Sequence, residues 1–170
     1  MLFRSASAAQ AIRKAYDIGW RPKQQYLTYV SAYVKMTLEP AGLEKSNGIM
    51  AMAFFKDATQ PRWANDPDTQ QFLAFMKKYA PDQDVNNAAG VYGYGVAQAM
   101  ELVLKAAGDN LTRENLLKQA TNLKAMRTDM LLPGVVLNTS PTDYWPFSTL
   151  QLVQFNGKEF APMGDAIPVK

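Results

Sequence analysis

The sequence predicts an α/β fold in which mixed helix and strand segments flank a block of helices. Three observations support this class. Residues 8–55 alternate between helical and strand patterns, residues 67–124 hold three consecutive helical patterns, and β-rich segments return after Pro133. An α/β architecture interrupted by a helical block is the simplest arrangement with this order.

The first region is predicted to contain a helix, a strand, a short helix and a second strand. Ser7 and Gln10 form a capping box at the start of the first helix, and Gly19 supplies a left-handed stop after its end. Apolar residues recur at helical spacing between these two signals. The later segments are a strand over 26–31, a short helix over 33–43, a turn at 46–48 and a strand over 49–55.

The helical block follows a polar connector, residues 57–67, which is bracketed by prolines and is typical of a link between two packing units. Asp66 caps the first helix, which begins at Pro67, the second helix ends at Gly108, and Thr112 caps the third. Each of these helices carries apolar residues, and we expect those of the first helix to be buried and those of the third to pack against other elements. The apolar stripes are Phe72, Phe75, Met76 and Tyr79 on the first, Val96, Ala99, Met100, Val103 and Ala107 on the second, and Leu116, Ala120 and Leu123 on the third.

The last part of the chain is predicted to be β-rich, with segments over 135–137, 150–155 and 158–163. Asn156 and Gly157 separate the last two segments, and both residue types tolerate a positive φ. The pair therefore predicts a type I′ hairpin, which needs a positive φ at both turn residues.

The composition argues against several classes of function. The chain has no cysteine and no histidine, so it lacks thiolate nucleophiles, disulfides, the usual general base at neutral pH and the commonest metal ligands. The net charge is +3, but the 18 basic residues are scattered, whereas nucleic-acid binding needs basic clusters. We therefore predict a protein that is not an enzyme, uses no metal or cofactor and binds no nucleic acid.

Neither a leader peptide nor a membrane span is expected from the sequence. The opening MLFRSASAAQ has a two-residue apolar start, which is too short for the hydrophobic part of a signal peptide. No stretch approaches the roughly twenty apolar residues of a membrane helix. A location outside the cytoplasm would therefore have to be inferred from resemblance to a protein family.

Several segments together resemble a known protein family. They are, in chain order, AAQAIRKAYDIGW, YLTYVSAYV, EPAGLEKSNGIMAMAFFKD, VYGYGVAQAMELVLKAAGDNLTRENL and LLPGVVLNTSPTDYWPFSTLQLVQFNGKEF. In order and in amino-acid sequence they are similar to the C-terminal portion of type I periplasmic solute-binding proteins, which serve ABC importers of branched-chain amino acids and other small hydrophobic acids. The resemblance covers nearly the whole chain, and it implies that roughly the first half of an ordinary member is absent.

The resemblance implies the C-terminal portion of a two-lobed fold. Residues 1–56 and 129–170 would belong to the second lobe, and the helical residues 57–128 to the first. Because these helices would lack the sheet that they normally cover, the chain is expected to form a homodimer, to swap the helical segment with a second copy, or to repack it on its own second lobe. The resemblance also implies a periplasmic location, a small-molecule ligand and a membrane permease as partner. A ligand-sensing regulatory or receptor module with the same fold is the alternative function.

The candidate ligand-binding residues are Tyr29, Val30, Ser31, Ala32, Phe54 and Tyr92. The first four lie where a predicted strand gives way to a helix-forming segment, which is where open α/β sheets place ligands. The resemblance implies that this strand end supplies contacts from the second lobe. Phe54 ends the next strand near the expected hinge, and the Tyr92 ring lies at a helix start, where it can line a pocket. Core or hinge packing without ligand contact is the alternative for all six.

The expected ligand class follows from a departure from the family. Amino-acid-binding members often carry an acidic residue at the first strand end, where it meets the ligand ammonium, whereas this chain has Val30 and Ser31 there. A buried ammonium without a carboxylate partner is strongly disfavoured. The expected ligand is therefore an aromatic or branched aliphatic carboxylic acid, with a branched-chain amino acid as the alternative.

Overall fold

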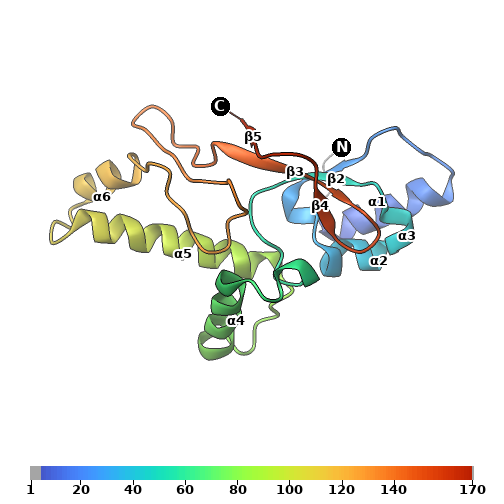
Figure 1. Ribbon diagram of the computed structural model, residues 1–170, viewed down its shortest axis with the longest axis horizontal. Coiled ribbons are helices and arrows are strands. Elements are labelled where there is room, and N and C mark those ends of the chain that lie inside the picture. Colours follow the sequence, from blue (N-terminus) through green and yellow to red (C-terminus); the bar gives the residue numbers. More distant parts are fainter. Residues whose placement is uncertain (1–4, 170) are drawn as a thin grey trace.

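The structure is a computed structural model that describes residues 5–169. Its elements are, in chain order, α1 (Ser5–Asp17), β1 (Tyr26–Leu27), the 3-10 turn η1 (Tyr29–Ser31), the π-helical turn η2 (Val34–Leu38), α2 (Glu39–Ala41), α3 (Leu43–Ser46), β2 (Met50–Ala53), the 3-10 turn η3 (Pro61–Trp63), α4 (Pro67–Tyr79), α5 (Ala88–Ala107), α6 (Arg113–Ala120), β3 (Thr149–Phe155), β4 (Phe160–Pro162) and β5 (Ile167–Pro168). Figure 1 shows α1–α3 beside the sheet at one end of an elongated molecule, α5 and α6 at the other end, and α4 projecting between them. This mixture of helices and strands confirms the predicted α/β class.

The sheet is mixed rather than purely parallel. Its strand order is β1-β2-β3-β4, with β5 paired to the beginning of β3. Only β1 and β2 run parallel; β2, β3 and β4 form antiparallel pairs, in which Ala51 faces Val153 and Phe155 faces Phe160. The parallel pair is connected through η1, η2, α2 and α3, whereas β3 reaches β2 only after the whole helical block. The chain thus returns to the same sheet from a distant part of the sequence.

The first helix begins earlier than predicted. α1 already includes Ser5, so Ser7 lies inside the helix and not at its cap. Alanines on both sides of Ser7 favour the helical conformation and allow the helix to continue through it. The predicted stop is correct, because Gly19 has a φ of +73° and lies just beyond the end of the helix. Ala8, Ala9 and Ile12 pack from this helix into the core.

The strand predicted over 26–31 is much shorter in the structure. Only Tyr26 and Leu27 pair with β2, and the chain then turns into η1. Ser31 donates its backbone N–H to Thr28 O at 2.9 Å, and Thr28 Oγ1 donates to Ser31 Oγ at 3.2 Å. These local bonds give the backbone an alternative to the strand ladder. The short helix predicted over 33–43 is likewise divided into η2, α2 and the start of α3.

The helical block has the predicted caps but only part of the predicted burial. Asp66 and Thr112 cap α4 and α6 by accepting backbone N–H groups, and Gly108 ends α5. Phe72 and Met76 are buried, whereas the other two residues of the α4 stripe, Phe75 and Tyr79, are exposed. The α5 stripe is also divided, since Val103 and Ala107 are buried and Val96 and Met100 are exposed. The stripe on α6 is half-buried at Leu116 and Ala120, while Leu123, just beyond the helix, is buried.

The final β region differs from the prediction at two points. Residues 135–137 form no strand, and Leu137 makes only isolated bridges to Met126 and Phe147. The hairpin of β3 and β4 has a four-residue loop, and Asn156 lacks the positive φ that a type I′ turn requires. Instead, the Asn156 side chain accepts the backbone N–H groups of Lys158 and Glu159 at 3.0 and 2.9 Å. This side-chain bonding replaces the two-residue turn.

One hydrophobic core connects the two ends of the molecule. Phe55, Phe72, Val91 and Leu131 belong to the same buried cluster as Ile12 and Phe155. The helical block is therefore packed on other parts of its own chain, as one of the three predicted outcomes requires, while a dimer or a segment swap stays a prediction. None of the helices within residues 5–169 is long and apolar enough to cross a membrane.

Candidate functional site

A pocket of about 510 Å³ opens beside the end of β2. Its walls come from η1 and the two residues between η1 and η2, the 53–63 segment, residues 132–134, β3, β4 and the segment that follows β4. The lining residues include Tyr29, Ala32, Tyr33, Ala53, Phe55, Asp57, Gln60, Trp63, Leu132, Gln151, Val153, Phe160 and Asp165. The volume lies within the range of small-molecule sites, and the lining combines apolar and aromatic side chains with a few polar groups, as is typical of such sites.

Asp57 is the most unusual residue in this lining. It is only 6% exposed. Its Oδ1 accepts hydrogen bonds from Thr59 N at 2.9 Å and Thr59 Oγ1 at 2.7 Å. Its Oδ2 is buried, and no hydrogen-bond donor reaches it from any residue in the described part of the chain. Buried carboxylate oxygens ordinarily have partners, so this atom is an exception among the buried polar groups.

Two tyrosines in the pocket lining have hydroxyl groups that contact each other. The hydroxyls of Tyr29 and Tyr33 are 2.6 Å apart, and Tyr29 donates to Phe55 O at 3.1 Å. Burial raises the pKa of both phenols above the ordinary value, and the negative charge of Asp57 adds to the rise. Both hydroxyls therefore stay protonated at neutral pH, and they can donate or accept hydrogen bonds.

An aromatic cluster adjoins the pocket through Tyr29. The ring centroid of Tyr29 lies 4.2 Å from that of Phe54, and the Phe54 centroid lies 4.3 Å from that of Phe147. Phe55 meets Tyr92 edge-on, with 6.0 Å between the ring centroids. The structure thus brings Tyr29, Phe54 and Tyr92, which are far apart in sequence, into one aromatic neighbourhood.

The six predicted site residues do not form one surface. Tyr29 and Ala32 line the pocket, whereas the other four do not. Val30 is 53% exposed, Ser31 is fully buried at the end of η1, Phe54 is half-buried within the aromatic cluster, and Tyr92 is exposed.

The polar residues of the pocket were missed in the sequence, because residues 57–67 have the composition of a linker. Asp57, Gln60 and Trp63 all lie in this segment, and Gln151 lies in the third strand. The aromatic ring of Trp63 in an otherwise polar segment was the one local signal that this segment packs against other parts of the chain. Gln60 and Gln151 are both buried, which no periodicity indicated. Within residues 5–169, no three acidic side chains are grouped closely enough to hold a metal ion.

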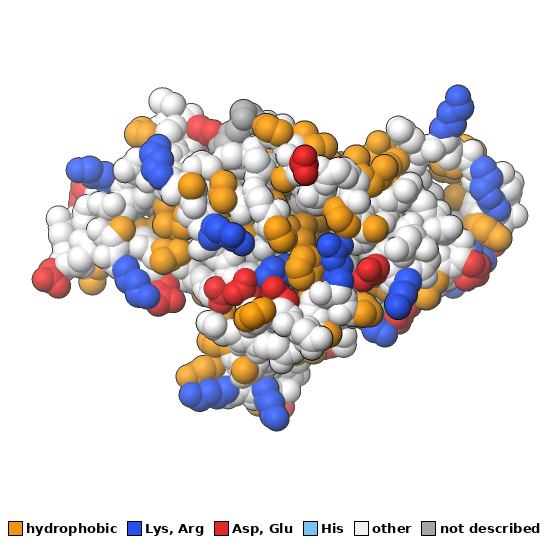
Figure 2. Space-filling model, in the orientation of Figure 1, with side chains coloured by type: hydrophobic (Ala, Val, Ile, Leu, Met, Phe, Trp, Pro, Cys, Tyr) orange, Lys and Arg blue, Asp and Glu red, His pale blue; other side chains and the backbone are white. Residues whose placement is uncertain are grey.

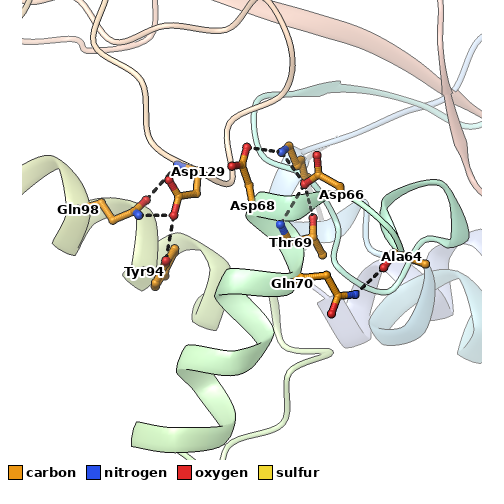
Figure 3. Close-up of polar contacts among 9 residues, drawn as sticks. Ala64, Asp66, Asp68, Thr69, Gln70, Tyr94, Gln98 and Asp129 are labelled. Atoms are coloured by element: carbon orange, nitrogen blue, oxygen red, sulfur yellow. Dashed lines mark hydrogen bonds and ion pairs between the residues drawn. The ribbon is translucent and has the colours of Figure 1, made fainter.

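An ion-pair cluster holds the segment that carries Asp57. The adjacent Lys56 is 2% exposed, and its Nζ lies 2.7 Å from Asp66 Oδ2 and 2.9 Å from Asp68 Oδ2. Asp66 Oδ2 also accepts from Thr69 N and Thr69 Oγ1 at 2.9 and 2.8 Å (Figure 3). Burial by itself would raise the pKa of Asp66, but the bonds from Lys56 and Thr69 outweigh it, so the pKa lies below its usual value. The cluster ties the end of β2 to the start of α4.

A second crossing segment pairs with the first. Lys56 N donates to Met130 O at 2.7 Å, and Leu132 N donates to Phe54 O at 2.9 Å. The chain thus passes between the sheet and the helical block in two neighbouring antiparallel segments, 54–56 and 130–132. Figure 3 shows how Asp129 anchors the second segment to α5. Its Oδ2 accepts from Tyr94 Oη at 3.0 Å and Gln98 Nε2 at 2.5 Å, and its backbone N–H donates to Gln98 Oε1 at 3.0 Å.

Replacing Tyr94 with phenylalanine is expected to lower the free energy of unfolding by about 1 kcal/mol, because Asp129 loses one donor and keeps Gln98. Burial raises the pKa of Tyr94 to about 12, and its bond to Asp129 contributes to the rise. Since the folded-state pKa lies above the ordinary 10.0, the bond contributes fully below pH 10.0 and is lost as the pH rises toward 12. Urea denaturation at about pH 8 and about pH 11 should show a smaller difference between the variants at the higher pH. An equal difference between the variants at both pH values would contradict a stabilising bond between the Tyr94 hydroxyl and Asp129.

Comparisons with known proteins agree with this architecture. A family model described as periplasmic binding protein matches residues 1–159. No curated protein sequence matches the chain. A branched-chain amino acid ABC transporter protein from Thermus thermophilus, solved with bound valine, is similar at a TM-score of 0.72 and 13% identity, over 97% of this chain and 44% of that chain.

Two further solved structures are similar. A substrate-binding periplasmic protein from Ralstonia solanacearum has a TM-score of 0.72 and 18% identity, over 95% of this chain and 44% of that chain. A leucine binding protein from Thermotoga maritima has a TM-score of 0.63 and 12% identity, over 99% of this chain and 43% of that chain. The chain spans less than half the length of these structures. At such identities they establish a common fold, while the family match extends over nearly all of the sequence, so the chain belongs to the periplasmic binding protein family.

Proposed function

We propose that the chain is part of an extracytoplasmic solute-binding protein of an ABC importer, which takes up branched-chain amino acids or related small hydrophobic or aromatic acids. The observation that carries the proposal is the pair of crossing segments beside the pocket, in which Phe54 and Lys56 bond to Leu132 and Met130. Adjacent crossing segments of this kind can act as a hinge, because a few backbone positions absorb the rotation of one body against another. The family match and the names of the similar structures support this reading.

The proposed boundaries assign residues 1–56 and 129–170 to the second lobe and residues 57–128 to the first. An uncovered stripe on α5 supports the division. Tyr92, Val96, Met100 and Leu104 recur every four residues, and all four are exposed. Figure 2 shows uncovered apolar side chains at the end of the molecule that holds α5 and α6 and on the projecting part that holds α4. A contiguous apolar helix face of this kind is ordinarily covered by another element, and a first-lobe sheet would provide that cover.

In the proposed mechanism, the ligand bridges two lobes and stabilises their closed arrangement without being chemically changed. The closed protein would then be recognised by a membrane permease. Because the first lobe is represented here only by helices, most of the bridging contacts from that side are missing. The 170-residue chain is therefore expected to bind ligand weakly, in the millimolar range or not at all.

Isothermal titration calorimetry tests the proposal with leucine, 4-methylpentanoate and phenylacetate. We expect a form of the protein with two complete lobes to bind at least one of these at micromolar concentration, and the 170-residue chain to bind none of them so tightly. Micromolar binding by the 170-residue chain would contradict the two-lobe mechanism. Absence of binding to all three compounds by the two-lobed form would contradict the proposed ligand class.

A further inference from the structure

The end of α1 and the loop that follows it form a tip with exposed aromatic and cationic side chains. We define the α1 tip as residues 13–25 together with Glu44 and Lys45, which line one hollow of about 380 Å³ with Tyr16, Trp20 and other tip residues. We propose that this tip docks on the surface of an anionic lipid membrane, with the Trp20 ring among the headgroups and the cations against the lipid phosphates. The inference goes beyond the proposed function and does not depend on ligand binding.

The fold gathers positive charge at the tip. Its cations are Arg13, Lys14, Arg21, Lys23 and Lys45, and its acids are Asp17 and Glu44. The rest of the chain holds equal numbers of basic and acidic residues, so the tip accounts for the whole net charge of +3. One of the two acids is already neutralised, since Asp17 Oδ1 lies 2.9 Å from Lys45 Nζ. An anionic membrane gains roughly fivefold in affinity for each cation near its surface, so the tip complements such a surface.

A helix-ending motif holds the backbone of Trp20 in place. Gly19 N donates to Tyr16 O at 3.0 Å, and Trp20 N donates to Ala15 O at 2.9 Å. These two bonds form a Schellman motif, which often packs an apolar residue at the Trp20 position back against the helix. Here, however, Trp20 is 59% exposed. The backbone is therefore fixed, while much of the indole is free to contact a partner.

The cations nearest to Trp20 are also held in place. Arg21 donates to Tyr16 O at 3.0 Å, and its guanidinium carbon lies 4.1 Å from the centroid of the Tyr16 ring. Lys45 Nζ lies 5.3 Å from the same centroid. In contrast, none of the ion pairs in the described part of the chain involves Lys14 or Lys23. These two lysines can therefore approach lipid phosphates without breaking an ion pair.

A membrane suits this surface better than a soluble polyanion does. The indole ring is amphipathic, and tryptophan is enriched where membranes meet water. Ile18, on the other side of Gly19, is 62% exposed. An aliphatic side chain gains from contact with lipid but finds no apolar partner on a polyanion such as heparin.

The tip lies at the opposite end of the sheet from the pocket. Gln25 and Ile49 line the hollow of the tip and immediately precede β1 and β2, whereas the pocket opens beside the end of β2. Figure 1 shows α1 at the end of the molecule away from α5 and α6, and Figure 2 shows Lys and Arg side chains standing out from that end. Docking through the tip would therefore leave the pocket accessible.

Vesicle sedimentation of the 170-residue chain tests the inference, with vesicles of phosphatidylcholine alone or with about 30% phosphatidylglycerol. We expect at least about tenfold tighter binding to the anionic vesicles, and release as the salt concentration rises from about 0.05 to about 0.5 M. Replacing Lys14 and Lys23 together with glutamine should lower this affinity at least about tenfold. Replacing Lys118 and Lys124 with glutamine removes the same charge from two other exposed sites and should change it less than about twofold.

The Trp20→Ala variant separates a membrane anchor from a purely electrostatic attraction. We expect it to lose at least about fivefold in affinity for the anionic vesicles. Its melting temperature should stay unchanged, because the indole is largely exposed. Trp145→Ala is the control, since Trp145 is 61% exposed and lies outside the tip. This control should bind the vesicles like the parent chain.

Equal binding to neutral and anionic vesicles, or no binding to either, would overturn the inference. Equal losses for the two lysine pairs would also overturn it, because the net charge and not the tip would then decide binding. Unchanged vesicle affinity of Trp20→Ala would overturn it as well, and tighter binding to heparin or single-stranded RNA would then assign the tip to a soluble polyanion. The proposed function would survive each of these results, because it is judged on ligand binding by the two-lobed protein.

Discussion

Replacing Asp66 with alanine is expected to lower the free energy of unfolding by about 3 kcal/mol, the sum of a lost helix cap and a lost ion-pair partner. Asp66 Oδ2 accepts from Lys56 Nζ at 2.7 Å and caps α4 through Thr69 N at 2.9 Å. The cap accounts for about 1 kcal/mol of the loss. The remainder arises because Lys56 is buried and would keep only Asp68, which is largely exposed. Urea denaturation at neutral pH measures the effect.

Two matched variants separate these contributions. Asp66→Asn keeps an oxygen that can cap Thr69 but removes the charge facing Lys56, so we expect a loss of about 2 kcal/mol. Asp68→Asn leaves the closer pair intact, and its loss should stay below about 1 kcal/mol, because exposed ion pairs contribute little. Equal losses for Asp66→Asn and Asp68→Asn would show that the ion pair of Lys56 with Asp66 contributes no more to the free energy of unfolding than its ion pair with Asp68.

The Asp66 cluster also makes an acid-sensitive contribution to stability. Because the pKa of Asp66 is lowered in the folded state, its contribution is present above the ordinary value of 3.8 and is lost as the pH falls through the lowered pKa. The difference between the parent chain and Asp66→Asn should therefore shrink in strongly acidic solution.

Replacing Gly95 with valine is expected to destabilise the protein by about 3 kcal/mol through overpacking. A Cβ at this position would lie 2.8 Å from two ring atoms of Phe55, closer than real side chains approach. The ring has little room to withdraw, since it already contacts Phe54, Tyr92 and Phe147. Displacing Phe55 would also disturb the crossing segment that pairs with Leu131.

Gly93 provides the control within the same helix. It lies two residues earlier in α5, and a Cβ there would meet no atom within 4 Å. Gly93→Ala is expected to stabilise the chain by about 0.5–1 kcal/mol, because alanine restricts the unfolded chain and favours the helix. Thermal and urea denaturation of Gly93→Ala and Gly95→Val should give shifts of opposite sign. A stabilising or neutral Gly95→Val substitution would show that Phe55 can move aside.

The local signals were the most successful part of the sequence analysis. Asp66 and Thr112 cap their helices as predicted, and Gly19 and Gly108 follow helix ends with positive φ. These features succeed because each depends on a few neighbouring residues and on backbone geometry alone. The α/β class was also correct, since it follows from the order of such local patterns.

The errors concern features that depend on distant contacts. The strand predicted over 26–31 stops after Leu27, where side-chain bonds of Thr28 and Ser31 take over. The Asn156–Gly157 pair lies in a longer loop, because Phe155 pairs with Phe160. The stripe on α4 was predicted as buried throughout, but periodicity specifies a face and not whether another element covers it.

By itself, the sequence determined the fold class, the helix boundaries marked by Asp66, Thr112, Gly19 and Gly108, and the resemblance to a solute-binding family that the family match confirms. Tyr29 and Ala32, two of its six candidate site residues, line the pocket, and ligand binding stays a prediction for all six. Only the tertiary structure decided that Asp57 is buried with one free oxygen beside two tyrosine hydroxyls. The reason is physical: a carboxylate in a polar segment is usually solvated, whereas Asp57 is buried in the lining of a pocket whose other walls include η1, β3 and the chain after β4, which no local pattern encodes.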